Sequence, residues 1–128
     1  MEVLIVDDDP LLSEYLQAVL RKALKAVIVA VARDLDSALE RTGVGEAPDL
    51  VLLDLGLPGC SGLEALLRFR SRFPGVRVAV VSANEEPKVI AAALEAGAIG
   101  FIPKTSKLDA MIAAIRHVAA GGTYVPPG

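Results

Sequence analysis

The sequence is poor in cysteine and in aromatic residues. It has one cysteine, no tryptophan and an aromatic fraction of only 4% in 128 residues. The single thiol, Cys60, cannot form an internal disulfide, which excludes a disulfide-stapled secreted domain and favours a reducing cytoplasm. Because rings are scarce, the core has to be built from valine, leucine, isoleucine and alanine, which dominate the 53% hydrophobic fraction.

The chain also lacks long apolar runs and an excess of positive charge. No stretch offers the ~18 uninterrupted apolar residues of a membrane span. The longest candidate, residues 89–103, is broken by Glu95, Gly97 and Gly100, and Met1 leads directly into a strand-like run that leaves no room for a signal peptide. The net charge of −3 provides no basic surface for nucleic acid. We therefore expect a cytoplasmic domain that contacts neither membrane nor DNA by itself.

Short apolar runs alternate with helical periodicity along the whole chain. Strands are predicted at residues 3–6, 26–31, 50–53, 76–81 and 99–102. Helices are predicted from Pro10, from Asp34 as N-cap to Gly43, from about Leu63 to the Pro74-Gly75 stop, over 87–96, and from about Leu108 to the Gly121-Gly122 stop. This alternation favours an α/β fold in three layers, with helices on both faces of a parallel sheet.

Four of the five predicted helices carry apolar residues at helical spacing on the face expected to lie inward. These positions are Leu12, Tyr15, Leu16, Val19 and Leu20, then Leu35, Ala38 and Leu39, then Leu63, Leu66, Leu67 and Phe69, and finally Leu108, Met111, Ile112, Ile115 and Val118. Asp9, just before Pro10, is predicted to cap the first helix.

Polar side chains follow four of the five predicted strands at the point where each strand ends. They are Asp7-Asp8-Asp9, Asp54, Ser82 and Lys104. The second strand is followed only by Ala32-Arg33, as expected of an edge strand. Ligands of open α/β sheets bind beyond the carboxyl ends of the strands, so we expect one site to collect these groups.

The chemistry of this set points to phosphoryl transfer. Several carboxylates in one cleft repel each other unless a cation lies among them, and Mg²⁺ takes carboxylate, water and phosphate oxygens as ligands. An aspartate can also act as a nucleophile and form an aspartyl-phosphate. Such a transfer needs positive charge and a donor around the phosphoryl oxygens, which an ammonium and a hydroxyl supply.

The ordered set of Asp7-Asp8, Asp54, Ser82 and Lys104 resembles the receiver (CheY-like) family of bacterial two-component response regulators. The resemblance covers essentially the whole chain. It implies a flavodoxin-like fold with a five-stranded parallel sheet of order 2-1-3-4-5 and five helices. It also implies a signalling receiver that promotes only its own phosphorylation and dephosphorylation, and is no enzyme beyond that.

The resemblance assigns a role to each residue at the strand ends. Asp54 is the implied phosphoacceptor for a histidine kinase. The implied Mg²⁺ ligands are Asp7, Asp8, Asp54 and the backbone carbonyl of Gly56. The implied phosphoryl contacts are Ser82 and Lys104, and the implied switch residues are Ser82 and Phe101, whose ring is expected to turn inward on phosphorylation and to alter a surface used for homodimers or for an output domain.

Three stretches resemble LuxR/NarL-type regulators more narrowly. They are residues 54–64, 100–105 and 120–127. In that subfamily a helix-turn-helix domain follows the receiver and binds DNA to regulate transcription. The sequence stops at Gly128, about where a linker would begin, so we expect a receiver over 1–122, the start of a linker over 123–128, and contact with DNA only through an output domain absent from these residues.

Two positions depart from the common pattern, and some single residues allow plainer interpretations. Gly56 lies where related receivers often carry asparagine, and Pro103 precedes Lys104 where many place proline after it. Phe101 could be a core residue as readily as a switch. Cys60 is expected to be inert, and His117 to lie on the surface.

Three other functions remain to be compared with a phospho-accepting receiver. A degenerate pseudo-receiver would serve only as an interaction module. A haloacid-dehalogenase-type phosphatase also uses a strand-end aspartate and Mg²⁺, but residues 7–11 lack the threonine of its motif and the chain has no cap domain. A flavodoxin-like flavin carrier needs a phosphate loop after the first strand, where an acidic triplet would repel phosphate.

Overall fold

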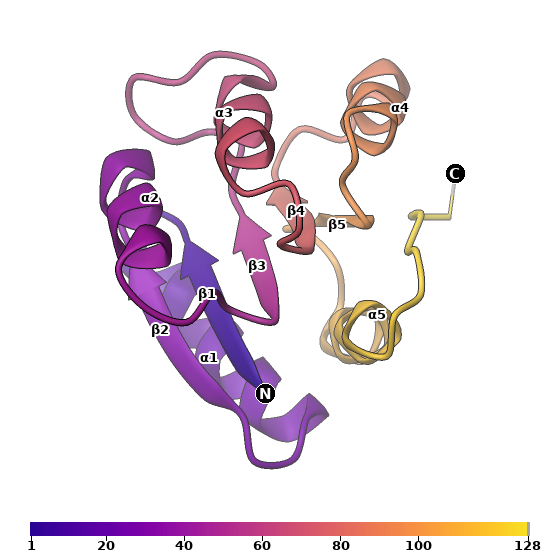
Figure 1. Cartoon of the computed structure of the whole chain (residues 1–128). Coiled ribbons are helices and arrows are strands. Elements are labelled where there is room, and N and C mark those ends of the chain that lie inside the picture. The colour runs from indigo at the N-terminus through magenta and orange to yellow at the C-terminus, as the bar shows by residue number, and fades with distance from the viewer. Residues whose placement is uncertain (128) are drawn as a thin grey trace.

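The computed structural model describes residues 1–127 and contains five strands that alternate with five helices (Figure 1). The strands are β1 (Glu2–Val6), β2 (Ile28–Ala32), β3 (Leu50–Leu53), β4 (Val78–Ser82) and β5 (Gly100–Pro103). The helices are α1 (Pro10–Ala23), α2 (Leu35–Gly43), α3 (Glu64–Arg72), α4 (Pro87–Glu95) and α5 (Leu108–Ala119). Among the described residues, no helix combines the length and the apolar character needed to cross a bilayer.

All strand pairs of the sheet are parallel, in the order β2-β1-β3-β4-β5. Val6, the last residue of β1, lies beside Ala32 of β2 and Leu53 of β3, and Ser82 of β4 lies beside Pro103 of β5. The carboxyl ends of the strands therefore meet at one edge of the sheet. The predicted strand order, the edge position of β2 and the flavodoxin-like fold class are confirmed.

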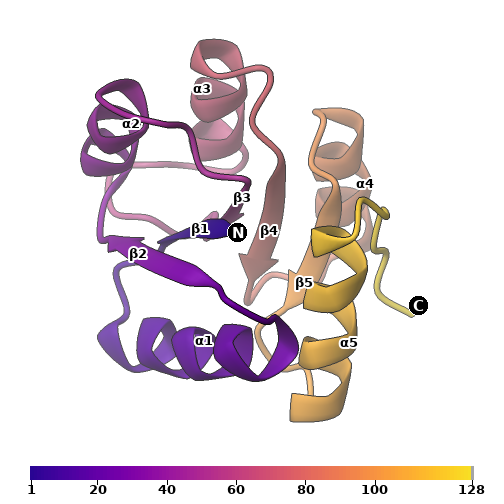
Figure 2. The same cartoon turned by 60° about the horizontal axis from the view of Figure 1, so that its bottom comes forward.

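Two apolar clusters, one on each face of the sheet, hold the three layers together. Leu4 and Val6 point into the cluster shared with α2, α3 and α4, whereas Val3 and Ile5 point into the cluster shared with α1 and α5. Figure 2 shows α1 on one side of the sheet and α2 and α3 on the other. Because alternate side chains bury on opposite faces, a central strand has to be apolar throughout, which explains the unbroken runs in the sequence.

Helix boundaries follow from capping groups that the sequence supplies. The Asp9 carboxylate accepts hydrogen bonds from the backbone N–H groups of Leu11 (3.0 Å) and Leu12 (3.3 Å), and Pro10 occupies the first turn of α1. The Asp34 carboxylate accepts from Ser37 N–H (2.7 Å) at the start of α2. Both predicted caps are confirmed, because a side-chain oxygen satisfies donors that have no partner within the helix.

Several predicted positions are corrected by the structure. β2 begins at Ile28 because Ala26 has a φ of 51°, a left-handed turn conformation that a strand cannot contain. Tyr15 and Leu67 were predicted to lie inward but are exposed, as is Leu108. Tyr15 precedes the buried Leu16 by one residue and Leu67 follows the buried Leu66 by one, and a single helical step rotates a side chain by about 100°.

The segment after α5 packs on the sheet rather than leaving it at once. Tyr124 forms a parallel bridge with Gly100 of β5, and its side chain is partly buried against the α1–α5 cluster. Part of the expected linker at 123–128 is thus in contact with the fold. Gly128, at its end, lies outside the described residues.

Candidate functional site

The strand ladder itself positions the two buried carboxylates. Asp7 directly follows β1, and its N–H donates to Ala32 O (3.0 Å). Asp54 directly follows β3, and its N–H donates to Val6 O (2.9 Å). Each aspartate is therefore still held by main-chain pairing, and its side chain emerges at the edge of the sheet from a fixed backbone.

Lys104 joins these two carboxylates. Its ammonium lies 3.2 Å from Asp7 Oδ2 and 3.2 Å from Asp54 Oδ2, and its side chain is 20% exposed. Its backbone N–H donates to Ser82 O (2.9 Å), which fixes the start of the loop after β5. Burial alone would lower the pKa of Lys104, but the charges of Asp54 and Asp7 outweigh it and raise that pKa above 10.5, so the ammonium stays charged.

The acidic groups gather as the sequence predicts. Asp7, Asp8 and Asp54 each offer an oxygen, and these oxygens all lie within 4.8 Å of one another. Asp7 and Asp54 are 1% and 4% exposed, whereas Asp8 is exposed. Burial raises the pKa of Asp7; the Asp9 N–H bond opposes the rise, and the Asp54 charge adds to it.

Both buried carboxylates use their two oxygens in the same way. Oδ1 accepts a main-chain N–H two residues ahead, from Asp9 (2.8 Å) for Asp7 and from Gly56 (3.0 Å) for Asp54. Oδ2 faces the shared centre. Among residues 1–127, Asp7 Oδ2 has no hydrogen-bond partner, because the nearby ammonium makes an ionic contact without hydrogen-bond alignment. Buried carboxylate oxygens in this condition are suited to a hard divalent cation, so the donor set fits a metal held by Asp7, Asp8 and Asp54.

A cavity opens over this centre. Asp54, Gly56, Ser82 and Lys104 line it, together with residues from the loop after β4 and from the first turns of α4. A Cβ placed on Gly56 would lie 3.5 Å from Asp54 Oδ1, an ordinary contact, so a larger side chain could stand there without strain. The cavity thus brings together Asp54, Ser82 and Lys104, the residues predicted to contact the phosphoryl group.

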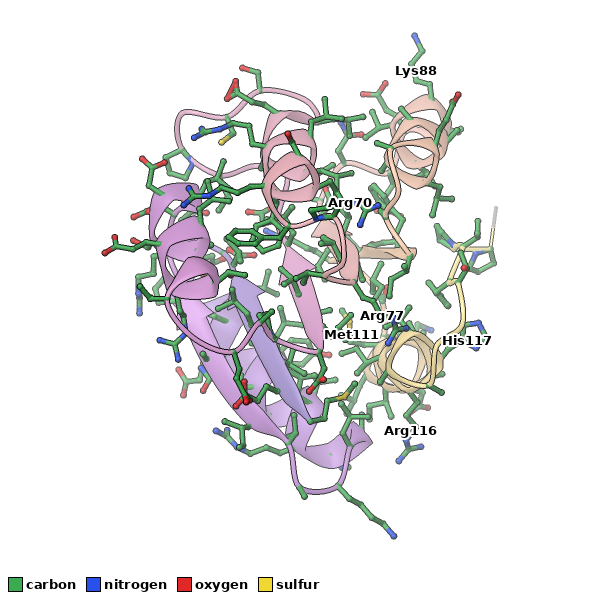
Figure 3. The ribbon with its side chains drawn as sticks, viewed as in Figure 1. Arg70, Arg77, Lys88, Met111, Arg116 and His117 are labelled. Carbon is green, nitrogen blue, oxygen red and sulfur yellow. The ribbon has the colours of Figure 1, made fainter. Side chains whose placement is uncertain are left out.

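Sequence reasoning missed two residues of the cavity wall, Asn84 and Lys88. The Asn84 N–H donates to Ser82 Oγ (3.1 Å), which orients the 3% exposed serine hydroxyl. Lys88 contributes its stem to the wall, while its ammonium projects away from α4 (Figure 3). The polar pattern of residues 82–88 was the available signal, but it indicates only a loop and a helix start.

Phe101, the predicted aromatic switch, is buried in this structure. Its side chain has no exposed surface and belongs to the cluster formed with α2, α3 and α4. The ring already lies inside the fold, which is where the expected inward turn would bring it. This burial agrees with both interpretations of Phe101, core packing and a switch, and the switch role stays a prediction.

Two further residues lie as the sequence predicts. Cys60 is half-buried at the cavity wall, and burial raises the pKa of its thiol, so it lacks the thiolate character of a reactive cysteine. His117 is exposed on α5.

Known proteins share this fold and much of this sequence. Residues 3–116 match the family described as the response regulator receiver domain. The glycerol metabolism activator of Pseudomonas putida is 40% identical over 126 residues, which are 98% of this chain and 57% of that protein. The transcriptional regulatory protein DegU of Brevibacillus brevis is 32% identical over 127 residues, 99% of this chain and 53% of that protein. The chain therefore spans little more than half the length of these curated relatives.

A solved structure agrees over nearly the whole chain. A LuxR family DNA-binding response regulator from Silicibacter pomeroyi superposes with a TM-score of 0.86 at 33% identity, covering 99% of this chain and 97% of that chain.

Proposed function

Because the chain belongs to the response regulator receiver domain family, we propose that Asp54 accepts a phosphoryl group from a histidine kinase and that Mg²⁺ assists the transfer. Asp7, Asp8, Asp54 and the Gly56 carbonyl are the proposed metal ligands. The observation that carries the proposal is the Lys104 ammonium, 3.2 Å from one oxygen of each buried carboxylate, in a cavity that also contains the Ser82 hydroxyl.

The proposed transfer uses groups that the fold holds in place. A carboxylate oxygen of Asp54 attacks phosphorus, and the bond from phosphorus to the imidazole nitrogen of the donor breaks. The electron pair stays on the imidazole, which leaves as a neutral ring once protonated. Bound Mg²⁺ would supply positive charge to the phosphoryl oxygens.

Lys104 and Ser82 complete the proposed phosphoryl site. The ammonium of Lys104 can move from Asp54 Oδ2 to a phosphoryl oxygen while it keeps its contact with Asp7. The oxygen of the Ser82 hydroxyl already accepts the Asn84 N–H, so its proton can be donated to another phosphoryl oxygen. Donors held near the place where charge develops stabilise that charge with little rearrangement.

Replacement of the acceptor tests the proposal. Asp54→Asn should abolish incorporation of phosphate from acetyl phosphate and Mg²⁺, measured as the mass increase of the intact protein. Asp36→Asn is the matched control, because Asp36 is an exposed aspartate outside the site and should leave the incorporation unchanged. Phosphate retained on Asp54→Asn would move the acceptor elsewhere. A wild-type protein that never takes up phosphate would favour a pseudo-receiver.

The wider role of the chain follows as a proposal from its relatives. Transcriptional regulators are among them, and the chain spans 57% and 53% of two of those proteins. We place the receiver at 1–122 and the start of a linker at 123–128. Phosphorylation would then control homodimer formation or a DNA-binding output domain.

A further inference from the structure

The segment after α5 continues the sheet beyond β5. The Tyr124 N–H donates to Ile99 O (3.0 Å), and the Phe101 N–H donates to Tyr124 O (3.0 Å). These two bonds flank the parallel bridge between Tyr124 and Gly100. Residues 123–125, here called the tail strand, therefore occupy the outer edge of β5, where the ladder would otherwise end.

A glycine in β5 makes this close approach possible. A Cβ on Gly100 would lie 2.9 Å from Val118 Cγ1 and 3.3 Å from Tyr124 Cβ, which is too close for either side chain to stay in place. Glycine in a strand interior weakens the strand, and it often marks a position where another backbone comes near. The close packing of Val118 of α5 and the approach of the tail strand together account for Gly100.

Hydrogen bonds hold the start of the tail strand on α5, and two prolines prevent its pairing with β5 from extending further. Gly122 N–H donates to His117 O (2.9 Å), and the His117 ring nitrogen Nε2 lies 3.0 Å from Thr123 O. Figure 3 shows His117 on the side of α5 that faces the tail. Pro126 and Pro127 lack an N–H and cannot extend the ladder. The pairing is thus confined to a short segment that local opening can release.

β5 connects the tail strand to the acidic site. Its edge pairs with Tyr124, and the residue after its last residue is Lys104, whose ammonium contacts Asp7 and Asp54. The Phe101 ring is packed in the core, but its N–H is engaged by Tyr124 O. A change at the site can therefore reach the tail through the β5 main chain, without rotation of the ring.

We propose that the tail strand is a releasable edge strand whose docking on β5 opposes filling of the acidic site. This rests on the proposed function. Both ladder bonds have the usual length of an N–H···O bond when Lys104 contacts the two carboxylates. A phosphoryl group on Asp54 draws the Lys104 ammonium from Asp54 Oδ2 toward its own oxygens, and a shift of β5 along its axis lengthens at least one of the two oppositely slanted bonds. Phosphorylation therefore frees residues 123–125, together with any segment attached to them.

Hydrogen exchange measured with and without beryllofluoride and Mg²⁺ tests the coupling in the full chain. Chemical shifts of Asp54 and Lys104 amides report occupancy of the site, and exchange of the Tyr124 and Phe101 amides reports docking of the tail strand. We expect exchange at the Tyr124 and Phe101 amides to accelerate by about fivefold or more, the ordinary size of a coupling between two sites. Shifts at Asp54 and Lys104 with unchanged exchange at Tyr124 and Phe101 would overturn the coupling alone. If the chemical shifts of the Asp54 and Lys104 amides do not change on addition of beryllofluoride and Mg²⁺, the proposed function is wrong, and so is the coupling that rests on it.

A pair of variants supplies the reciprocal measurement. Tyr124→Gly removes the partly buried side chain of the tail strand, whereas Val125→Gly removes an exposed one and is the matched control. Because coupling between two binding equilibria is reciprocal, Tyr124→Gly should tighten the apparent binding of beryllofluoride by about fivefold or more, and Val125→Gly should not. Equal affinities in a Tyr124→Gly protein whose Phe101 amide exchanges freely would contradict the inference.

Discussion

At the scale of single residues, the candidate site is a place where the fold accepts an unfavourable charge. Asp7 is almost fully buried, and burial raises its pKa despite the ammonium of Lys104 and the N–H of Asp9. The folded protein therefore holds the Asp7 proton more tightly than the unfolded chain does. This contribution favours the fold below a pH of about 3.8, the ordinary pKa, and is lost as the pH rises through the raised pKa.

An uncharged side chain of the same shape should remove this cost. We expect Asp7→Asn to stabilise the protein at pH 7, with Tm rising roughly 4 °C for each kcal/mol recovered in a domain near this size. The gain should shrink as the pH falls through the raised pKa of Asp7, where the wild-type carboxylate takes up its proton. Thermal unfolding as a function of pH measures both effects, with the exposed Asp109→Asn as control. A lower Tm for Asp7→Asn at pH 7 would show that its contact with Lys104 outweighs burial.

Much of this site could be predicted at the residue scale, because the carboxyl ends of parallel strands lie at the same edge of the sheet. Asp7, Asp54, Ser82 and Lys104 each follow an apolar run, and the runs determine where they meet. The orphaned Oδ2 of Asp7 could not be predicted, since it depends on hydrogen-bond angles. The packed ring of Phe101 could not either, because a single aromatic in a strand is compatible with both core and switch.

At the scale of elements, the end of α4 is set by a glycine and an arginine from a different helix. Gly97 has a φ of 103°, and a Cβ there would lie 2.7 Å from Arg70 Nε of α3. Arg70 Nη1 donates to Pro74 O (2.8 Å) in the turn after α3, so the guanidinium is held against the α4 terminus (Figure 3). Gly97 therefore serves both the backbone turn and the packing between α3 and α4.

Substitution of Gly97 should be costly for both reasons. Gly97→Ala should lower the free energy of unfolding by at least ~1 kcal/mol, the scale of forcing an alanine into left-handed backbone. Gly75→Ala is the control, because its Cβ would meet nothing within 4 Å and its φ is not positive; it should be neutral or mildly stabilising. Urea unfolding of the two variants gives the comparison. Equal free energies of unfolding for the two variants would mean that the backbone at the end of α4 adjusts to alanine without cost.

Element boundaries were less predictable than element identities. The 50–53 strand and the Asp34 cap follow from local chemistry and are confirmed, whereas the start of β2 depends on the backbone turn at Ala26. The pairing of Tyr124 with β5 could not be inferred from composition, because glycine, threonine and proline in that segment are typical of a linker. Gly100 was a possible signal, but glycine in a short strand has several explanations.

At the scale of the whole molecule, stability should decrease from the centre of the sheet to its edges. β3 and β4 are buried along their full length, whereas β2 has one fully buried residue and an exposed Ile28. The tail strand has only an isolated bridge to β5. The middle of the sheet and β5 are therefore covered by the apolar clusters, whereas β2 and the tail strand are only partly covered.

Native-state hydrogen exchange should follow this order. Amides of β1, β3 and β4 should exchange only through global unfolding, while those of β2 and Tyr124 should exchange through local opening at lower free energy. The dependence of exchange on low concentrations of denaturant separates the two routes. Uniform protection across all strands would contradict a sheet that opens from its edges.

The single cysteine has a practical consequence for following this protein at work. Cys60 stands in the wall of the cavity above Asp54, half-buried and with a thiol that stays protonated at neutral pH. A fluorophore or spin label attached there, at an alkaline pH that deprotonates the thiol, needs no other cysteine removed, and it would lie beside the proposed phosphorylation site. The unmodified sequence thus already contains one attachment site for an optical or magnetic reporter of the proposed phosphorylation.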